Sequence, residues 1–420
     1  MSHPDSPCTL IVGSGHAGGE AAFSLRQNGY TGRVVLIGNE TSLPYQRPPL
    51  SKGFLAGAVD EQALLIRPVE AYEKANIETR TGVQVVRLDT AQKIIELSDG
   101  SSLGYSHLIL ATGSRPRQLA DLDPERPLVN LHYLRNLGHA QQMREQMLEG
   151  KRLVIIGGGY IGLEVAAVAL KQGLKVSLVE SMERILARVT AAEVSSFYQQ
   201  IHQVAGAMLH LNAHLDRLNL DASGERVESV QLTDGSVFPA DLVLVGIGAI
   251  ANTELAEQAG LAVDNGIVVD EYTRSSDPFI HAIGDCSNHP SELYGRRVRL
   301  ESIPNAIEQA RTAALAICGK PSPYRSVPWF WSDQFELKLQ TVGLSQGHDQ
   351  TCLRGSPALR SFVVFYLREG QMIAADCINR QSEFALIKKL VQGRHTPDAQ
   401  QLGDDSMSLK DILAQANTPA

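Results

Sequence analysis

LIVGSGHAGGEAA (residues 10–22) returns later in the chain as VIIGGGYIGLEVA (residues 154–166). Each copy begins with an apolar, β-branched run, continues into Gly-x-Gly-x-x-Gly and leads into a helix-like stretch. This pattern predicts a buried parallel strand, a tight turn and a helix, the order typical of a dinucleotide-binding fold. The two copies are identical at Ile11/Ile155, Gly13/Gly157, Gly15/Gly159, Gly18/Gly162, Glu20/Glu164 and Ala22/Ala166.

The glycines of such a motif have separate roles. The first permits the tight turn, the second lets the backbone approach a pyrophosphate, and the third lets the helix pack closely on the strand. The free N–H groups and positive dipole at the start of the helix then favour phosphate. One copy could be only a glycine-rich turn, but two copies in the same context favour two dinucleotide sites.

A second repeat supports this organisation. IELSDGSSLGYSHLILATG (residues 95–113) and VQLTDGSVFPADLVLVGIG (residues 230–248) both read as a strand, an Asp-Gly turn and a strand that returns into glycine. The chain therefore holds two copies of one Rossmann-like unit. Two dinucleotide folds in one chain suit an enzyme that holds a flavin and a nicotinamide, since a flavin accepts a hydride and can release single electrons.

Composition restricts the class of protein. A chain of 420 residues predicts two to three domains, and 43% hydrophobic with 20% charged residues is ordinary for a globular protein. No apolar run has membrane-spanning length and no secretory signal is evident, so we expect a cytoplasmic protein that binds no membrane. A formal charge of -8 argues against a general nucleic-acid binder. The widely spaced cysteines (Cys8, Cys286, Cys318, Cys352 and Cys377) favour free thiols and no metal site.

The chain resembles a known family in the two glycine motifs and in four further segments. It is similar to the FAD-dependent pyridine nucleotide–disulfide oxidoreductases, and within them to the ferredoxin reductases of class I oxygenase and P450 systems. The resemblance implies an α/β fold with two Rossmann-like domains, as in glutathione reductase, plus a C-terminal α/β domain. The implied domains are 1–113 with 247–325 for FAD, 114–246 for NAD, and 326–420 as the C-terminal reductase domain. The segments are PPLSKGFLAG (48–57), ATGSRPR (111–117), IGDC (283–286), VPWFWSDQFELKLQ (327–340) and the glycine motifs themselves.

The FAD pyrophosphate is expected over Gly13, Gly15 and Ala17. Either Asn39 or Glu40, at the end of the next strand, should bind the adenosine ribose, and Glu40 is preferred because a carboxylate accepts two hydroxyl bonds. The resemblance implies that Lys52 lies near flavin N5, where a cation stabilises reduced-flavin charge. It also implies FAD contacts for Arg47, Val85, Thr112, Gly113, Arg135, Asp285, Ile303 and Trp331. For Asp285, a helix N-cap role is the alternative.

The NAD site is expected at the second motif, at Gly157, Gly159, Tyr160 and Ile161. Glu180 ends the following strand and is predicted to bind the ribose 2′-OH, which favours NADH over NADPH. Arg184 weakens this preference, because a nearby arginine can accommodate a 2′-phosphate. The resemblance implies that Tyr160 covers the flavin and that Glu164 contacts the nicotinamide. A surface-turn tyrosine and a packing glutamate are the alternatives.

Cysteine, tryptophan and basic residues bear on the identity of the electron acceptor. No cysteine lies in residues 42–48, which excludes the thiol relay of disulfide reductases in this superfamily. The resemblance implies an acidic [2Fe–2S] ferredoxin as partner, docked through Arg311, Lys338 and Trp329. The basic residues Arg296, Arg297 and Arg299 are a further candidate patch. The sequence thus predicts an NADH:ferredoxin oxidoreductase; alternatives are a rubredoxin or dioxygenase reductase, or an NADH-responsive redox sensor.

The C-terminal region carries three local predictions. Residues 335–340 alternate as a half-buried strand should. Residues 361–379 read as two strands around Glu369-Gly370, and residues 382–393 as an amphipathic helix with Ser382 as its N-cap.

Overall fold

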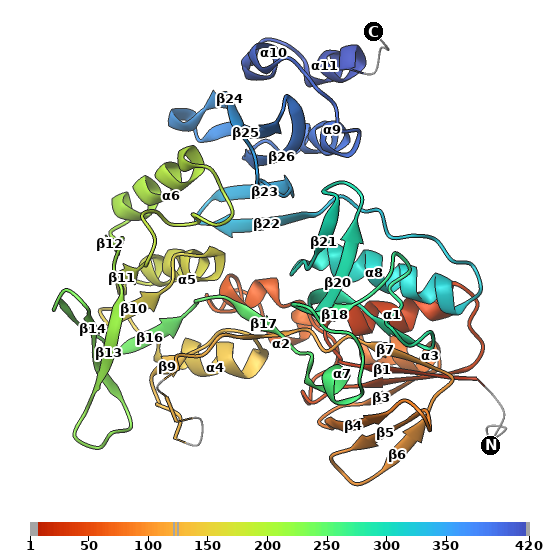
Figure 1. The fold of residues 1–420 in the computed structure, drawn as a ribbon. Helices are drawn as coiled ribbons and strands as arrows, with labels where there is room; N and C mark the ends of the chain where they lie inside the picture. Colours follow the sequence, from red (N-terminus) through yellow and green to blue (C-terminus); the bar gives the residue numbers. More distant parts are fainter. Residues whose placement is uncertain (1–6, 121, 124–125, 417–420) are drawn as a thin grey trace. The chain divides into compact units, whose positions relative to one another are not determined.

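A computed structural model describes residues 7–120, 122–123 and 126–416 (Figure 1). The chain divides into two compact units, which are described separately. The first contains Met1–Arg47, Glu61–Arg115 and Ala249–Pro328, and the second contains Pro48–Asp60, Pro116–Gly248 and Trp329–Ala420. The domain boundaries expected from the sequence stay predictions, and residues 1–6, 121, 124–125 and 417–420, which they include, lie outside the described residues.

The first unit is built on a five-stranded parallel sheet with the order β19-β7-β1-β2-β3. β1 is the strand predicted before the first glycine motif, and α1 follows the motif directly. The sheet and its main helices are β1 (Cys8–Val12), α1 (His16–Gln27), β2 (Arg33–Ile37), α3 (Val69–Lys74), β3 (Ile77–Arg80), β7 (His107–Leu110), β19 (Ile280–Ala282) and α8 (Ile303–Ile317).

Smaller elements complete this unit. Two three-stranded sheets have the orders β4-β5-β6 and β18-β20-β21. The remaining elements are α2 (Glu61–Leu64), β4 (Val85–Asp89), β5 (Ile94–Leu97), β6 (Ser102–Gly104), β8 (Ser114–Pro116), β17 (Ala249–Ala251), α7 (Glu254–Gln258), β18 (Ile267–Val268), η2 (Gly284–Cys286), β20 (Ser287–Ser291) and β21 (Arg296–Val298).

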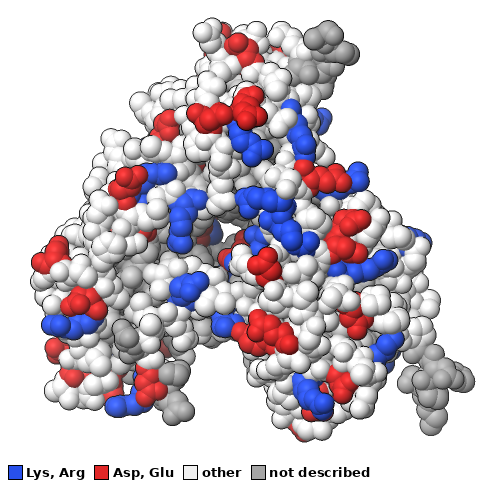
Figure 2. Space-filling view, in the orientation of Figure 1, with Lys and Arg blue, Asp and Glu red and all other residues white. Residues whose placement is uncertain are grey.

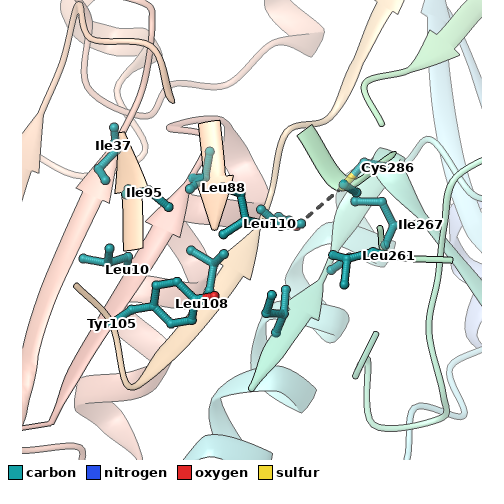
Figure 3. Close-up of a cluster of buried hydrophobic side chains, with 14 of the residues drawn as sticks. Leu10, Ile37, Leu88, Ile95, Tyr105, Leu108, Leu110, Leu261, Ile267 and Cys286 are labelled. Carbon is teal, nitrogen blue, oxygen red and sulfur yellow. Dashed lines mark hydrogen bonds between the residues drawn. The ribbon is translucent and has the colours of Figure 1, made fainter. Parts of the chain in front are cut away.

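Both faces of the parallel sheet are buried, as expected for parallel strands. Ile11 and Ile109 pack with alanines of α1 and α8 on one face. Leu10 and Leu108 point to the other face, where they meet Ile95 of the three-stranded sheet β4-β5-β6 in the cluster of Figure 3. Because side chains alternate between two buried faces, the run Leu10–Val12 is apolar throughout. The packing on both faces also fixes the position of the glycine turn at the carboxyl end of β1.

The second unit contains the repeated fold. Its parallel sheet has the order β12-β11-β10-β16-β9, and the antiparallel sheet β13-β14-β15 packs on Val154, Val179 and Val243. The elements are η1 (Pro48–Ser51), β9 (Leu131–His132), α4 (Leu137–Gln146), β10 (Arg152–Ile156), α5 (Tyr160–Lys171), β11 (Lys175–Val179), α6 (Ala192–Val204), β12 (Met208–His210), β13 (Leu215–Leu220), β14 (Val227–Leu232), β15 (Val237–Pro239) and β16 (Leu242–Val245). Two Rossmann-like sheets are therefore confirmed.

The same unit holds the C-terminal antiparallel sheet, with the order β22-β23-β26-β25-β24. Among the described residues no helix, here or elsewhere, is long and apolar enough to cross a membrane. The elements are β22 (Trp329–Gln334), β23 (Leu337–Gly343), β24 (Gln350–Ser356), η3 (Pro357–Leu359), β25 (Ser361–Arg368), β26 (Gln371–Ile378), α9 (Gln381–Gln392), α10 (Ala399–Gly403) and α11 (Leu409–Ala416).

Two local predictions for this region are wrong in detail. The strand predicted over 335–340 begins at Leu337, because Phe335 (φ 57°) and Glu336 form the turn between β22 and β23. Ser382 is not an N-cap, since α9 starts one residue earlier and Arg380 precedes it. The hairpin around Glu369-Gly370 is confirmed by the pairing of β25 with β26.

Candidate functional site

The first glycine of each motif is fixed by the backbone. Gly13 has φ +113° and Gly157 has φ +109°, a region that L side chains rarely adopt. A Cβ would also lie 2.1 Å from the Ala111 carbonyl oxygen in the first turn and 2.4 Å from the Gly246 carbonyl oxygen in the second. Each turn therefore sits against the strand next to it, and only glycine fits there.

The second glycine of each motif faces open space. A Cβ on Gly159 would have no atom within 4 Å, and one on Gly15 would meet only Arg47 Nη2, at 3.9 Å. Both glycines lie in the extended region and precede helices α1 and α5, whose first turns have no side-chain cap and no acidic residue. Free N–H groups beside open space are what a pyrophosphate requires. The residues present thus fit one dinucleotide on each sheet. The assignment of FAD to the first turn and of the nicotinamide dinucleotide to the second stays a prediction.

The acid at the end of β2 is held by neighbours in the first unit. The Glu40 carboxylate accepts a hydrogen bond from Tyr45 Oη at 2.5 Å and pairs with the Arg47 guanidinium, which also lies beside Gly15. Asn39 is exposed. These contacts place Glu40 and Arg47 beside the first glycine turn. The choice between Asn39 and Glu40 for the FAD ribose stays a prediction.

Glu180 is held against the second glycine turn. Its carboxylate accepts hydrogen bonds from the Gly158 N–H (2.7 Å) and the Met182 N–H (2.8 Å), so it lies at the carboxyl end of β11 beside the turn. Arg184 points away from such a role, because its guanidinium donates to the Thr190 carbonyl (2.8 Å) and to Ser195 Oγ (2.6 Å). The Arg184 guanidinium, which could have accommodated a 2′-phosphate, thus forms its hydrogen bonds within the protein.

Other predicted FAD residues lie in the first unit. Thr112 Oγ1 donates to the Asn252 carbonyl at 2.7 Å, and Gly113 (φ +69°) ends this segment. Asp285 accepts a hydrogen bond from Ser114 Oγ at 2.8 Å. The alternative role for Asp285 as a helix N-cap is wrong, since it lies inside η2, which leads into β20. Ile303 begins α8, Ala17 lies in the first turn of α1, and Val85 packs against the hydrophobic core.

The two predicted catalytic residues of opposite charge meet in the second unit. Lys52 Nζ lies 2.7 Å from Glu164 Oε2 on α5, and the Glu164 side chain is only 5% exposed. Ser51 Oγ donates to the same oxygen at 2.5 Å, and Ser332 Oγ of β22 donates to Oε1 at 2.6 Å. Three donors on one buried carboxylate make a satisfied, rigid group. The sequence pointed to Lys52 and Glu164 separately but not to their pairing or to the serines.

One signal for this pairing was present in the repeat. Glu20 occupies the position of Glu164 in the first copy, and it forms an ion pair with Arg67 at 2.7 Å. In both copies the shared glutamate therefore holds a cation that comes from another segment. The signal does not name the cation, because Lys52 and Arg67 have no equivalent places in the repeat.

Tyr160 begins α5 and its ring packs edge-on against Phe330, with ring centroids 4.7 Å apart. Its hydroxyl is buried, and burial together with the nearby Asp376 carboxylate raises the pKa of Tyr160 well above its usual value. Ile161 is 46% exposed at the next position. Trp329 and Trp331 lie on β22 with ring centroids 5.8 Å apart, and Arg135 lies in the loop between β9 and α4. These contacts leave the predicted roles of the aromatic residues and of Arg135 as predictions.

Asp376 is a buried acid that was not predicted from the sequence. Its carboxylate accepts hydrogen bonds from Thr341 Oγ1 (2.6 Å) and Tyr366 Oη (2.5 Å), and Tyr366 Oη in turn accepts one from the Ala191 N–H. Burial raises the pKa of Asp376 to about 6. Nothing in the stretch AADCIN distinguishes this residue from a surface aspartate, since its burial depends on the pairing of β26 with two neighbours.

Asp376→Asn should change how stability depends on pH. The carboxyl of an unfolded chain titrates near 3.9, so the higher pKa of the folded state stabilises the fold at low pH and this contribution is lost as the pH rises through about 6. Relative to the unaltered chain, the variant should therefore gain up to about 3 kcal/mol in unfolding free energy between pH 4 and pH 7. Urea unfolding across this range measures the difference, and parallel pH profiles would refute it.

The predicted docking residues differ in exposure and in their contacts, and Trp329 and Arg299 are only half-buried rather than exposed. Arg311 and Lys338 are exposed, on α8 and β23 respectively. Arg297 donates to the Val269 and Asn288 carbonyls, and Arg299 pairs with Glu301 at 2.6 Å, so these two side chains are engaged within the first unit. Acidic and basic side chains are interspersed on the face drawn in Figure 2. Arg311 and Lys338 therefore stay the better candidates of the predicted basic residues.

Comparison with known proteins decides the family. Residues 8–310 match the model of the pyridine nucleotide-disulphide oxidoreductases, and residues 329–413 match the reductase C-terminal model. The chain belongs to the pyridine nucleotide-disulphide oxidoreductase family. It carries the reductase C-terminal domain that the sequence segment VPWFWSDQ predicted.

Several relatives are reductases of ferredoxins, and one is a rubredoxin reductase. The chain is 45% identical to putidaredoxin reductase of Pseudomonas putida over 97% of both chains. It is 42% identical to the ferredoxin reductase subunit of the 5,5'-dehydrodivanillate O-demethylase of a Sphingobium strain, over 96% of this chain and 98% of that one. A crystal structure of the covalent putidaredoxin reductase–putidaredoxin complex matches with a TM-score of 0.96 and 44% identity, covering 99% of this chain and 100% of that one. The predicted family, fold class and enzyme class are thus confirmed.

Proposed function

We propose that this protein is an NADH-dependent ferredoxin reductase that supplies electrons to an oxygenase, for example a P450. The observation that carries the proposal is the pair of open, uncapped glycine turns, one on each parallel sheet, in a chain whose relatives are named reductases of ferredoxins. FAD, when bound, accepts a hydride from NADH and releases its electrons singly. The five cysteines are free thiols, which supports a reducing compartment and hence the cytoplasm.

The residues of the chain have separate tasks in this proposal. Gly13, Gly15 and Ala17 hold the FAD pyrophosphate, with Glu40 for the adenosine ribose. Gly157, Gly159 and Glu180 bind the nicotinamide dinucleotide. The Lys52–Glu164 ion pair is fixed in place for hydride transfer. Lys52 stabilises the charge of the reduced flavin, and Glu164 contacts the nicotinamide. Catalysis then consists of positioning and charge stabilisation, and it needs no protein nucleophile.

Glu180 should decide the choice of coenzyme. Its carboxylate suits a ribose 2′-OH and repels a 2′-phosphate, and the nearby Arg184 is engaged elsewhere. We therefore expect NADH to be strongly preferred, and Glu180→Ala to lower kcat/KM for NADH by about tenfold or more, since charge-assisted hydrogen bonds are lost. Steady-state ferricyanide reduction with each coenzyme measures this. The exposed Glu183→Ala is the matched control, and equal losses in both variants would contradict the assignment.

Charge reversal at Arg311 should weaken the binding of the ferredoxin and leave the reaction with NADH unchanged. Ferredoxins are acidic, so Arg311→Glu should raise the KM for a [2Fe–2S] ferredoxin by about tenfold at low salt while NADH-to-ferricyanide turnover stays unchanged. Lys410→Glu, a reversal in the last described helix, controls for net charge. An unchanged ferredoxin KM would remove Arg311 from the docking surface. A rise in KM that disappears at high salt in both variants would point to net charge rather than to a specific contact.

A further inference from the structure

A hydrogen-bond chain runs through the interior of the second unit to Glu164. Gln334 Oε1 lies 2.9 Å from His202 Nε2, Gln334 Nε2 lies 3.3 Å from Ser332 Oγ, and Ser332 Oγ lies 2.6 Å from Glu164 Oε1. His202 and Ser332 are 0% exposed and Gln334 is 1% exposed. The chain thus links the C-terminal sheet and α6 to the carboxylate on α5 without contact with solvent.

The donors in this chain all point toward Glu164. The carboxylate only accepts, so the Ser332 hydroxyl donates to it and accepts from the Gln334 amide N–H. The Gln334 carbonyl oxygen then needs a donor, which is the Nε2–H of His202. Burial lowers the pKa of His202, in keeping with a neutral ring, and its Nδ1 has no partner among the described residues. One proton arrangement therefore makes all three hydrogen bonds of the chain at once.

Ser332 fixes the orientation of the Glu164 carboxylate, which the other two donors cannot do. Ser51 and Lys52 both bind Oε2, which leaves the carboxylate free to turn about that oxygen. Ser332 donates to the other oxygen, Oε1, so it fixes the plane of the carboxylate. Strand alternation places Ser332 and Gln334 on the buried face of β22, opposite the half-buried Trp329 and Trp331.

We propose that Ser332 is a positioning residue for the Glu164–Lys52 pair, so that the C-terminal domain takes part in the reaction with NADH and not only in partner docking. The inference rests on the proposed function of Glu164. Removing Ser332 should leave the ion pair intact but let the carboxylate turn. The rate of hydride transfer should then fall more than the affinity for the nicotinamide, because misplacement affects the transition state most.

The test compares three variants in anaerobic stopped-flow reduction of the bound flavin by NADH. Ser332→Ala should slow reduction at saturating NADH by about tenfold, the effect of one lost hydrogen bond to a charged group. Ser332→Thr, which keeps the hydroxyl, should restore the rate. Thr351→Ala is the matched control, since Thr351 also joins the C-terminal sheet to a glutamate, Glu193 of α6, at 3.1 Å. It should reduce at the unaltered rate.

Two further readouts separate positioning from unfolding. The NAD⁺ dissociation constant by calorimetry and the thermal midpoint of Ser332→Ala should stay close to those of Thr351→Ala.

If Ser332→Ala does not fold, Gln334→Leu breaks the hydrogen-bond chain one step further from Glu164 and should slow reduction a few-fold. An unaltered rate in Ser332→Ala, or in Gln334→Leu where that variant replaces it, would overturn the proposal, as would a failure of Ser332→Thr to restore the rate. No ferredoxin is present in this assay, so its failure leaves the partner assignment standing, and failure of ferredoxin reduction leaves this inference standing.

Discussion

Gly15→Val should yield a protein without FAD, whereas Gly159→Val should bind FAD normally and lose saturation by NADH. Both glycines have extended backbone angles that valine adopts readily, and neither Cβ would clash with the protein. A valine side chain would instead fill the open space at the start of α1 or α5. A phosphate could then no longer approach the free N–H groups of that turn.

The size of the effect follows from the hydrogen bonds between phosphate and backbone N–H groups that the blocked turn could no longer form. We expect flavin content, read from the flavin absorbance, to fall below about a tenth in Gly15→Val. In Gly159→Val the KM for NADH should rise by about 100-fold or more, equivalent to about 3 kcal/mol of binding. Each variant is the control for the other, because the two sites lie on separate sheets. Loss of FAD in both variants, or in neither, would contradict the assignment of one dinucleotide to each turn.

Lys52→Met should damage both stability and rate. It leaves the Glu164 carboxylate buried with only two serine donors, and breaking a buried ion pair from one side costs about 3–5 kcal/mol. If Lys52 serves the flavin as proposed, the rate of flavin reduction by NADH should also fall by about 100-fold or more. Thermal unfolding and stopped-flow reduction measure the two effects.

A second substitution separates these effects. Lys52→Met with Glu164→Gln removes the unpaired charge, so it should recover most of the stability without recovering the rate. Arg33→Met, which breaks the exposed pair with Glu78, should cost less than about 1 kcal/mol. A double variant that regains the rate would show that Lys52 acts only on stability.

Local sequence patterns predicted the parts of the structure that depend on neighbouring residues. The strands and helices around Gly13 and Gly157 follow from apolar runs and glycine spacing, and the structure has them where expected. The turn at Phe335 was missed because a non-glycine residue with positive φ carries no sequence signal, and the alternating pattern continues through it.

The contacts of the site depend on residues far apart in the chain. Ser51, Glu164 and Ser332 come from three segments, and a serine has no property in the sequence that marks it as a carboxylate partner. The engagement of Arg184 by Thr190 and Ser195 likewise appears only once the loop after β11 is folded. Such contacts can be found only when the tertiary structure is known, whereas residue types and spacing were enough to name the glycines and Glu180.

The most direct test of the proposed function is NADH-driven reduction of cytochrome c, with and without an added [2Fe–2S] ferredoxin, repeated with NADPH. We predict a rate that depends on the ferredoxin and on NADH, with little activity from NADPH. Equal consumption of NADH with and without the ferredoxin, with oxygen as the acceptor, would contradict the proposed function and favour an oxidase or a redox sensor.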